Sequence, residues 1–325
     1  MSAFARKPVE FGVYLPQVKF SFEELRERVR LAERLGYDSI WFYDHFYSPA
    51  APDVPAFESW TLAAALAAVT QRIRFGHLVL CNAFRHPALL AQMALTLDSI
   101  SQGRIDLGIG SGSQPREFEE YGLPYPSFAE RAAQLEEAVQ VIKLLFTQTR
   151  SSFTGKYYTL KDAPSPLRPV QHPHPPIIVG GGGEKFTLPI VARHADVWNC
   201  PTYSLAEYQR KLDVLQRECA KVGRDPATLR VSEEAVLVVA ESAALPAAVE
   251  AAKRRYHYAN WGLEAGGYIG TPEQLVAHIL GKVERGVTQF SFFFHDRASP
   301  QSLELFATRV IPAVKRETKS LTSAT

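Results

Sequence analysis

The sequence has few cysteines and no long hydrophobic segment. Its 325 residues include only Cys81, Cys200 and Cys219, too few and too scattered for a disulfide framework or a zinc site. No apolar run approaches the roughly 20 residues that cross a bilayer, and the first residues lack the apolar core of a signal peptide. We therefore expect a cytoplasmic protein that does not act at membranes.

Excess charge and several common binding motifs are also missing. A net charge of +2 without a basic run gives no reason to expect a nucleic-acid partner. No Gly-x-Gly-x-x-Gly is followed by an acid about 20 residues on, which argues against a nicotinamide-binding Rossmann domain. The absence of a P-loop argues against a P-loop NTPase, and the absence of Gly-x-Ser-x-Gly argues against an α/β-hydrolase. Helical His-x-x-x-His spacing is missing too, so we expect no metal.

Short apolar segments alternate with amphipathic ones along the whole chain. The predicted strands cover 11–16, 39–44, 72–80, 104–110, 176–180, 196–200, 230–240 and 289–295. The predicted helices cover 22–35, 58–70, 87–100, 128–146, 184–194, 204–222, 271–285 and 299–315. This alternation predicts an α/β fold, a single (β/α)8 TIM barrel over residues 1–325, with a doubly wound open sheet as the alternative.

Two segments depart from this alternation. Residues 150–174 begin with a pattern typical of a small hairpin around Gly155 and continue as a proline-rich connector, so we interpret them as an insertion after strand four. The last segment, 316–325, is expected to be a frayed tail.

A glycine run follows the predicted fifth strand. The segment from Pro175 to Glu184 is an apolar run that ends in four glycines, and a helical pattern starts at once. Glycines let a ligand approach the backbone closely, and a helix N-terminus offers free N–H groups to an anion. We interpret Gly181, Gly182 and Gly183 as a phosphate cradle; a tight turn is the alternative.

The other predicted strand ends carry groups suited to proton transfer. In a TIM barrel, functional residues follow the carboxyl ends of the strands. Asp44–His45 and His295–Asp296 both lie there, and histidine titrates near neutrality. For the first pair the alternative is a capping Asp beside a packed His, and Asp296 is equally explained as a helix cap. His77, within the third strand, is expected to face a helix.

Further residues near these strand ends are candidates for ligand contact. Gly110, Ser111, Gly112 and Ser113 offer backbone N–H groups and two hydroxyls beside the glycine run. Aromatic residues near the same end line either a pocket or the core: Phe42, Phe46, Tyr47, Phe57, Trp60, Phe84, Trp198 and Trp261. A phosphate cradle, a proton-transfer histidine and apolar strand ends together suit a large planar phosphorylated cofactor.

Several motifs in this order resemble the bacterial luciferase-like superfamily of flavin- and deazaflavin-dependent oxidoreductases. They span nearly the whole chain: Ala32–Trp41 leading into Asp44–His45, Arg85–Met93, Thr96–Arg104, Leu107–Gly112, the glycine run, Ala195–Asn199 and Gly270–Gln274. The resemblance is strongest to the branch that uses coenzyme F420. Family members are barrels with an insertion after strand four.

The resemblance implies roles for individual residues. It implies that His45 serves in proton transfer, that Asp44 contacts the deazaflavin ring, and that a cis peptide at Leu78–Val79 supports its back face. It places Cys81 and Asn82 beside the ring and the phosphate on Gly181, Gly182 and Gly183. With Gly110, Ser111 and Gly112, these residues form the expected cofactor site.

Two departures from the family pattern bear on the substrate. Sugar-phosphate and alcohol dehydrogenases of this branch have a carboxylate where this chain has Ser113, and no lysine follows directly after Asn199. We therefore expect hydride transfer between F420 and a small organic substrate, an unsaturated or carbonyl compound if the enzyme is a reductase. An FMN-dependent monooxygenase and a non-catalytic flavin-binding barrel are the alternatives. A homodimer is expected.

Overall fold

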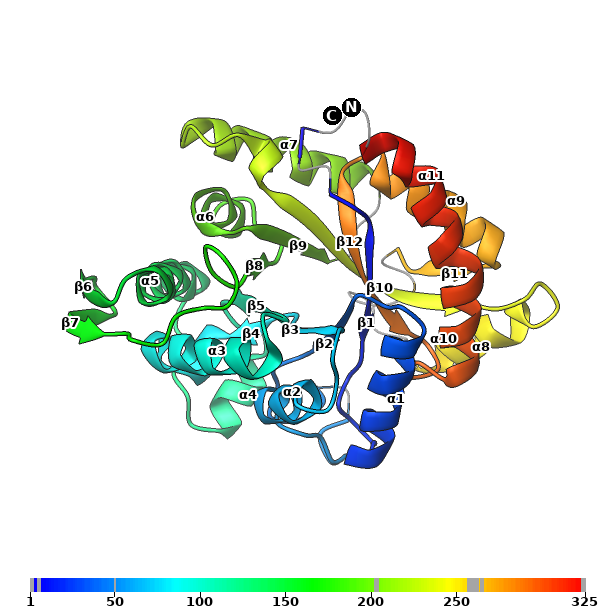
Figure 1. Cartoon of the computed structure of the whole chain (residues 1–325), viewed down its shortest axis with the longest axis horizontal. Helices are drawn as coiled ribbons and strands as arrows, with labels where there is room; N and C mark the ends of the chain where they lie inside the picture. Colours follow the sequence, from blue (N-terminus) through cyan, green and yellow to red (C-terminus); the bar gives the residue numbers. More distant parts are fainter. Residues whose placement is uncertain are drawn as a thin grey trace.

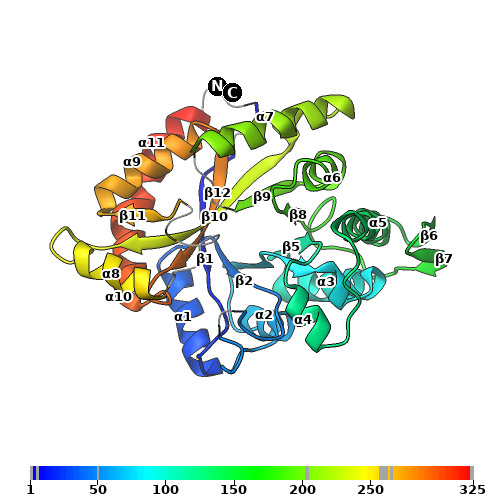
Figure 2. The ribbon, with the colours of Figure 1, turned by 180° about the vertical axis from the view of Figure 1, so that it is seen from behind.

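The computed structural model of the chain is a closed barrel of parallel strands surrounded by helices (Figures 1 and 2). The structure describes residues 3–4, 7–49, 51–201, 205–255, 263 and 266–322. The eight strands that form the barrel are β1 (Glu10–Tyr14), β2 (Ser39–Phe42), β3 (Arg74–His77), β5 (Ile105–Gly110), β8 (Ile177–Gly180), β9 (Val197–Pro201), β10 (Arg230–Val239) and β12 (Val287–Phe294).

Strand β10 closes the barrel. Its first half pairs in parallel with β9, from Arg230 opposite Val197 to Glu234 opposite Pro201. Its other edge pairs with β12, which in turn pairs with β1. A doubly wound sheet would leave two free edges, so this pairing confirms the TIM barrel and excludes the open-sheet alternative.

Helices cover the outside of the barrel. They are α1 (Phe22–Arg34), α2 (Ser59–Ala67), α3 (Pro87–Ser101), α4 (Pro115–Glu120), α5 (Phe128–Thr147), α6 (Thr187–His194), α7 (Leu205–Lys221), α8 (Leu245–Arg255), α9 (Pro272–Val283), α10 (Pro300–Leu305) and α11 (Ile311–Thr322). Local sequence explains where many begin: Ser21 and Glu24 form a capping box at α1, and proline occupies the first turn of α3 and α9. Several of them contact the strands directly, among them α2 on β3, α3 on β5 and α6 on β8.

The predicted third strand is interrupted. It extends only over β3, and after Leu78–Val79 the chain resumes as β4 (Leu80–Cys81), which pairs with β5. The peptide bond between Leu78 and Val79 is cis, as predicted. The interruption brings the Leu78–Val79 backbone to the carboxyl end of the barrel.

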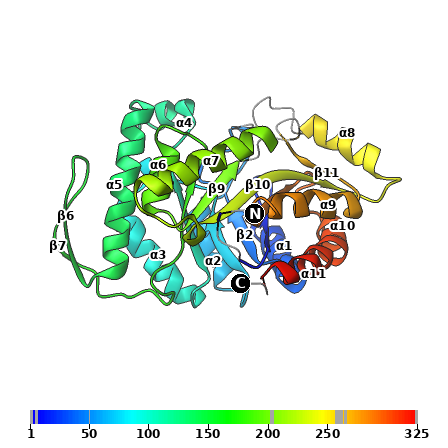
Figure 3. The same cartoon turned by 90° about the horizontal axis from the view of Figure 1, so that it is seen from above.

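The segment after α5 is an antiparallel hairpin of β6 (Arg150–Thr154) and β7 (Thr159–Pro164). It projects outward beside α5, away from the barrel (Figure 3). The Glu137 carboxylate on α5 accepts backbone N–H bonds from Lys156, Tyr157 and Tyr158, which fixes the turn of the hairpin to the helix.

Two regions differ from the sequence prediction. The helix predicted from residue 184 begins only at Thr187, because a turn occupies 184–186. At the other end, α11 continues to Thr322 although fraying is predicted after Arg316, because Val314 and the buried Thr318 extend one helical stripe against the barrel.

Between β10 and α9 the chain also forms α8 and a short strand β11 (Tyr268–Gly270), neither of which was predicted.

Candidate functional site

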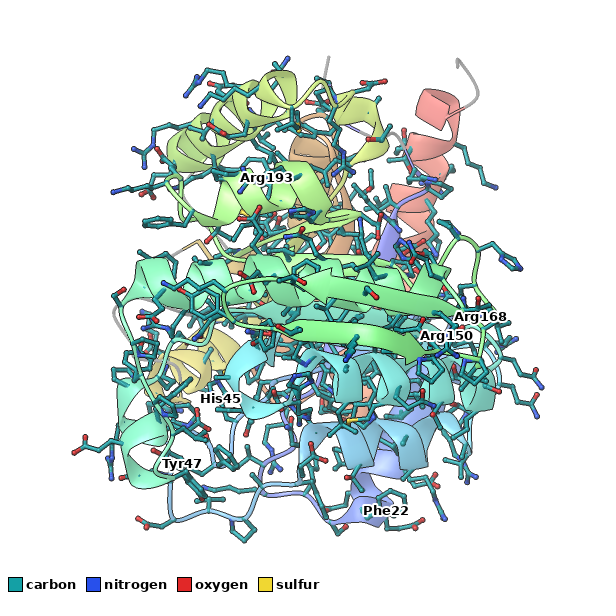
Figure 4. All side chains as sticks on the ribbon, turned by 90° about the vertical axis from the view of Figure 1, so that its left-hand side faces the viewer. Phe22, His45, Tyr47, Arg150, Arg168 and Arg193 are labelled. Atoms are coloured by element: carbon teal, nitrogen blue, oxygen red, sulfur yellow. The ribbon has the colours of Figure 1, made fainter. Side chains whose placement is uncertain are left out.

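A cavity of about 1220 Å³ opens at the carboxyl ends of the strands. All but one of the predicted site residues line it: Asp44, His45, Leu78, Val79, Cys81, Gly110, Ser111, Gly112, Gly181, Gly182 and Gly183. In Figure 4, His45 and Tyr47 lie toward this end of the barrel, whereas Arg150 and Arg168 lie toward the other. The cavity is large enough for a cofactor and a small substrate together.

One wall of the cavity is formed by the Leu78–Val79 segment, and glycines of the neighbouring strands pack directly against Val79. A Cβ atom on Gly110 would lie 2.7 Å from Val79 Cγ2, and one on Gly180 would lie 2.8 Å from Val79 Cγ1. Such distances are shorter than van der Waals contact, so larger residues would displace Val79. The glycines of β5 and β8 therefore let Val79 seat between them and face the cavity.

The glycine loop after β8 directs backbone donors into the cavity. Gly181 has φ +113°, a conformation that favours glycine. Its carbonyl accepts from Trp198 Nε1 at 2.9 Å, and the Gly182 carbonyl accepts from Lys211 Nζ at 2.8 Å. N–H and C=O point in opposite directions across a trans peptide, so the N–H groups of Gly182 and Gly183 point away from these two partners.

The later start of α6 changes how this loop would hold an anion. Thr187 is the first residue of α6 and its side chain lines the cavity. A turn at residues 184–186 separates Thr187 from Gly183. An anion bound at the glycine run would therefore meet the N–H groups of the loop itself and not those of the first turn of α6. We therefore propose a backbone anion site at this loop, with the amides of Gly182 and Gly183 as its donors.

Asp44 is a buried anchor. Its carboxylate accepts two bonds from the Arg85 guanidinium, at 2.8 and 3.0 Å, and further bonds from the Cys81 N–H at 2.8 Å and the Ser59 hydroxyl at 3.0 Å. A paired and hydrogen-bonded carboxylate is the form in which a buried charge is tolerated. Asp44 thus holds β4 against the end of β2.

His45 is held by a carboxylate from a different element. Its Nδ1 lies 2.8 Å from Glu117 Oε2, and Glu117 Oε1 accepts from the Phe46 N–H. Glu117 is 2 % exposed and belongs to α4, the short helix after β5. Asp44, the neighbour of His45 in the sequence, does not hold the imidazole, because Arg85, Cys81 and Ser59 occupy its carboxylate oxygens.

This arrangement sets the proton position on His45. A carboxylate accepts the Nδ1 proton, which leaves Nε2 as the nitrogen that can exchange a proton with a molecule in the cavity. The carboxylate that the family pattern has at position 113 is absent here. Glu117, four residues further on, brings a carboxylate to the histidine from α4 instead.

Cys81 contributes an apolar surface. Burial raises the pKa of its thiol to about 12, so it remains protonated at neutral pH and is not a nucleophile. A Cβ atom on Gly112, which has φ +79°, would lie 2.8 Å from Cys81 Sγ. The glycine–serine segment after β5 therefore packs closely on this part of the wall.

The opposite wall carries side chains that the sequence analysis missed. Tyr14, Glu234, Phe293 and Arg297 line the cavity from β1, β10, β12 and the loop after β12. Burial raises the pKa of Glu234 to about 8 and that of Tyr14 well above its ordinary value, so both are neutral at pH 7. Glu234 was missed because Glu233–Glu234 looks like a surface pair in the sequence.

Other candidates lie elsewhere. Asn82, the remaining predicted cofactor residue, does not line the cavity; its amide donates to the Tyr158 hydroxyl at 3.2 Å. His77 faces helix α2, as predicted: its ring stacks on that of Trp60 with 5.3 Å between the ring centroids. Burial lowers the pKa of His77 to about 4. Asp296 accepts from the N–H and hydroxyl groups of Ser299, but Ser299 itself is the N-cap of α10, so Asp296 lies before the helix and supports its cap.

The remaining predictions have mixed outcomes. Of the described aromatic candidates only Phe84 lines the cavity, and Trp261 lies outside the described residues. Within the described ranges, His, Cys, Asp and Glu side chains form no group of three or more that would suit a metal ion. In that same part of the chain, none of the helices has the length and apolarity that crossing a membrane requires.

Comparison with known proteins places the chain in a family. Residues 8–262 match the luciferase-like monooxygenase family, and the chain belongs to it. Over 182 residues the chain is 38 % identical to a protein of Amycolatopsis mediterranei named F420-dependent glucose-6-phosphate dehydrogenase. That match covers 54 % of this chain and 51 % of the relative, so the chain matches about half of the relative's length.

Solved structures share the fold over almost the full chain. An F420-dependent secondary alcohol dehydrogenase in complex with an F420–acetone adduct superposes with a TM-score of 0.80 at 21 % identity, covering 95 % of this chain and 99 % of that one. The oxygenating constituent of 3,6-diketocamphane monooxygenase from Pseudomonas putida, in complex with FMN, has a TM-score of 0.77 at 20 % identity, covering 94 % and 99 %. At such identities the likeness establishes the fold alone.

Proposed function

We propose that the protein is an oxidoreductase that transfers a hydride between coenzyme F420 and a small organic substrate. The observation that carries this proposal is a flat wall at Val79, backed by glycines, in the same cavity as a histidine whose proton position Glu117 sets. The sequence similarity to a relative named as F420-dependent supports the choice of cofactor.

The residues present fit a planar phosphorylated cofactor. A flat ring requires a wall without protruding side chains, which Gly110 and Gly180 provide around Val79. A phosphate requires donors, and the N–H groups of Gly182 and Gly183 are directed away from Trp198 and Lys211 at the cavity lining. F420, when bound, supplies or accepts the hydride.

The chain's own residues then perform the proton chemistry. A hydride leaves or reaches the substrate with a change of charge, so a proton has to move as well. His45 Nε2 gives or takes this proton, while the Glu117 carboxylate holds Nδ1–H and stabilises the imidazolium.

We propose an unsaturated or carbonyl compound as the substrate class. Ser113 in place of a carboxylate and the lack of lysine directly after Asn199 argue against a sugar phosphate. Tyr14, Tyr43 and Phe293 give the substrate side an aromatic lining that suits a compact apolar molecule. We further propose that the enzyme is a homodimer located in the cytoplasm. Size-exclusion chromatography with light scattering tests the dimer.

Titration of the purified protein with F420 and with FMN tests the cofactor. Binding of F420 with reduction of a ketone or enone, without oxygen consumption, supports the proposal. Binding of FMN with substrate-dependent oxygen consumption would instead assign a flavin monooxygenase, an alternative suggested by the shared fold with the 3,6-diketocamphane monooxygenase constituent solved in complex with FMN. Tight binding of either cofactor without turnover of any donor or acceptor would assign a non-catalytic binding barrel.

A further inference from the structure

Two carbonyl groups of the glycine loop are held by side chains of neighbouring elements. The Gly181 carbonyl accepts from Trp198 Nε1 on β9 at 2.9 Å, and the Gly182 carbonyl accepts from Lys211 Nζ on α7 at 2.8 Å. A run of glycines has more backbone freedom than other sequences, whereas a loop that binds through its N–H groups needs one fixed conformation. The two bonds therefore fix two peptide planes that the glycines alone leave free.

The other backbone groups of the loop complete this arrangement. The Gly181 N–H donates to the Asn199 carbonyl at 3.1 Å, and the Gly183 carbonyl accepts from the Leu188 N–H at 3.0 Å. Among the described residues, no hydrogen bond is donated by the N–H of Gly182 or of Gly183. Both glycines line the cavity, and a buried backbone donor needs a partner, so these two N–H groups are available to a ligand there.

Helix α7 supports both of the side-chain bonds. Tyr208 is fully buried, and its ring stacks on that of Trp198 with 6.4 Å between the ring centroids and 7° between the planes. Lys211 follows three residues later, on the same face of the helix, and also donates to Glu184 Oε1 at 2.9 Å. The side chain of Lys211 is only 12 % exposed. The helix therefore presents an ordered ring and an ordered ammonium group to the outer side of the loop.

We propose that Lys211 and Trp198 are positioning residues for anion binding, because they hold the loop in the orientation that directs the N–H groups of Gly182 and Gly183 at a phosphate. Neither side chain lines the cavity, so both act through the loop and not by touching the anion. Lys211 also polarises the Gly182 carbonyl, which strengthens the N–H donor at the other end of that peptide group. The inference rests on the proposed function in that it takes the loop as the phosphate site of the cofactor.

Binding of inorganic phosphate to the full-length protein, followed by phosphorus NMR, tests the inference without cofactor or turnover. Lys211→Met keeps an unbranched side chain without a donor, so the dissociation constant should rise about tenfold as the Gly182–Gly183 peptide becomes free to turn. Lys211→Arg keeps a charged donor and should recover most of the affinity. Trp198→Phe keeps an aromatic ring without the N–H group and should also weaken binding. A wild-type protein that leaves the phosphate signal unchanged would overturn the proposal.

Two further variants separate positioning from charge. Lys185→Met removes the same charge two residues after Gly183, but Lys185 is exposed and its Nζ lies over the Phe186 ring, so screening should keep phosphate affinity within about twofold of wild type. Glu184→Gln removes the ion pair with Lys211 and takes a negative charge away from the loop, so it should bind phosphate at least as tightly as wild type. An equal loss of affinity in Lys185→Met and Lys211→Met, or a loss in Glu184→Gln, would overturn the proposal.

Glycine-labelled protein shows the loop orientation directly in amide NMR spectra. In wild type, phosphate should shift the N–H resonances of Gly182 and Gly183. In Lys211→Met the same resonances should broaden or double before phosphate is added, because the peptide has more than one orientation. Urea denaturation shows that the variants are folded. Sharp, single resonances in Lys211→Met at the wild-type positions would overturn the positioning role.

The experiment also separates this inference from the proposed function. If F420 does not bind but phosphate binding still depends on Lys211, the proposed cofactor is wrong and the inference about the loop holds. If F420 binds and is turned over but Lys211→Met binds phosphate and F420 like wild type, only the inference is wrong.

Discussion

The two halves of the cavity are built from different kinds of residue. The half formed by β4, β5 and β8 consists of backbone, glycine and the small side chains Val79 and Cys81. The half formed by β10, β12, β1 and β2 carries long polar and aromatic side chains, among them Glu234, Tyr14 and His45. The first half offers mainly backbone groups and small hydroxyls, such as Ser111 and Ser113, whereas the second carries the larger acid, phenol and imidazole groups.

This difference suggests that one half of the cavity binds the cofactor and the other half binds and converts the substrate. Backbone N–H groups and a surface made of glycines bind a phosphate and a ring by shape, and they do not distinguish one substrate from another. This suits a cofactor that is the same in every turnover. Titratable side chains can be matched to one substrate by small changes in sequence, as TIM barrels commonly do at their strand ends. We therefore expect mutations in the glycine half to change cofactor affinity and mutations in the other half to change rate.

The largest expected effect is that of His45→Ala. Loss of general acid–base assistance should lower kcat by roughly 10² to 10⁴, because the imidazole that Glu117 holds at the cavity is removed. The dissociation constant for F420 should change by less than about threefold. Steady-state kinetics and fluorescence titration measure the two quantities, and His86→Ala, an exposed histidine outside the cavity, is the control. A collapse of cofactor binding with unchanged kcat would make His45 a binding residue.

Gly182→Val tests the glycine half. A branched side chain beside the loop amides should hinder the phosphate and weaken cofactor binding at least tenfold, about 1.4 kcal/mol. The free energy of unfolding, from urea denaturation, should change less than the binding free energy. Gly281→Val in α9 is a matched control, since an added Cβ atom there would meet only Arg285 Nη1 at 3.8 Å. Unchanged cofactor affinity in Gly182→Val would contradict the placement of the phosphate.

Glu117→Gln should have a smaller effect, on rate rather than on cofactor affinity. The amide can still accept the Nδ1–H bond but does not stabilise a charged imidazolium, so kcat should fall about tenfold. Glu120→Gln, on the exposed face of the same helix, is the control. A kcat equal to that of wild type would show that Glu117 only supports the loop.

The barrel and much of its site follow from local sequence patterns. Strand ends at Asp44–His45, Gly110–Gly112 and the glycine run are recognisable because apolar runs end there and parallel strands share one functional edge. The closing contact between β9 and β10 and the break after His77 are tertiary features. The cis bond at Leu78–Val79 was predicted from family resemblance rather than from residue types.

The missed residues share a physical reason. Glu234 was not predicted at all, and Glu117 was considered only as a substitute proton donor and not as the partner of His45. Both acids have acidic neighbours in the sequence that suggest a solvent-exposed surface, and only the folded chain shows that Glu117 contacts His45 and that Glu234 lines the cavity. Likewise, the sequence places Asp44 next to His45, but Arg85, distant along the chain, takes up its carboxylate. Pairing between side chains from separate elements is not encoded in local spacing.

The smallest expected effect concerns Asn82, at the boundary of the glycine half. Family resemblance places this residue beside the ring, whereas its side-chain amide donates to Tyr158 of the hairpin β6–β7 segment. Asn82→Ala should therefore leave the F420 dissociation constant within about twofold. Stability should fall by about 1 kcal/mol, because a partly buried hydrogen bond is lost.

Tyr158→Phe separates the two readings of Asn82, since it removes the same hydrogen bond and leaves the asparagine in place. In a double-mutant cycle measured by urea denaturation, the two substitutions should show a coupling energy of about 0.5–1 kcal/mol, as neighbours that share one bond do. Cofactor affinity should be the same in all four proteins. If Asn82→Ala weakens F420 binding tenfold while Tyr158→Phe does not, Asn82 contacts the cofactor directly, and the glycine half uses a side-chain amide as well as its backbone.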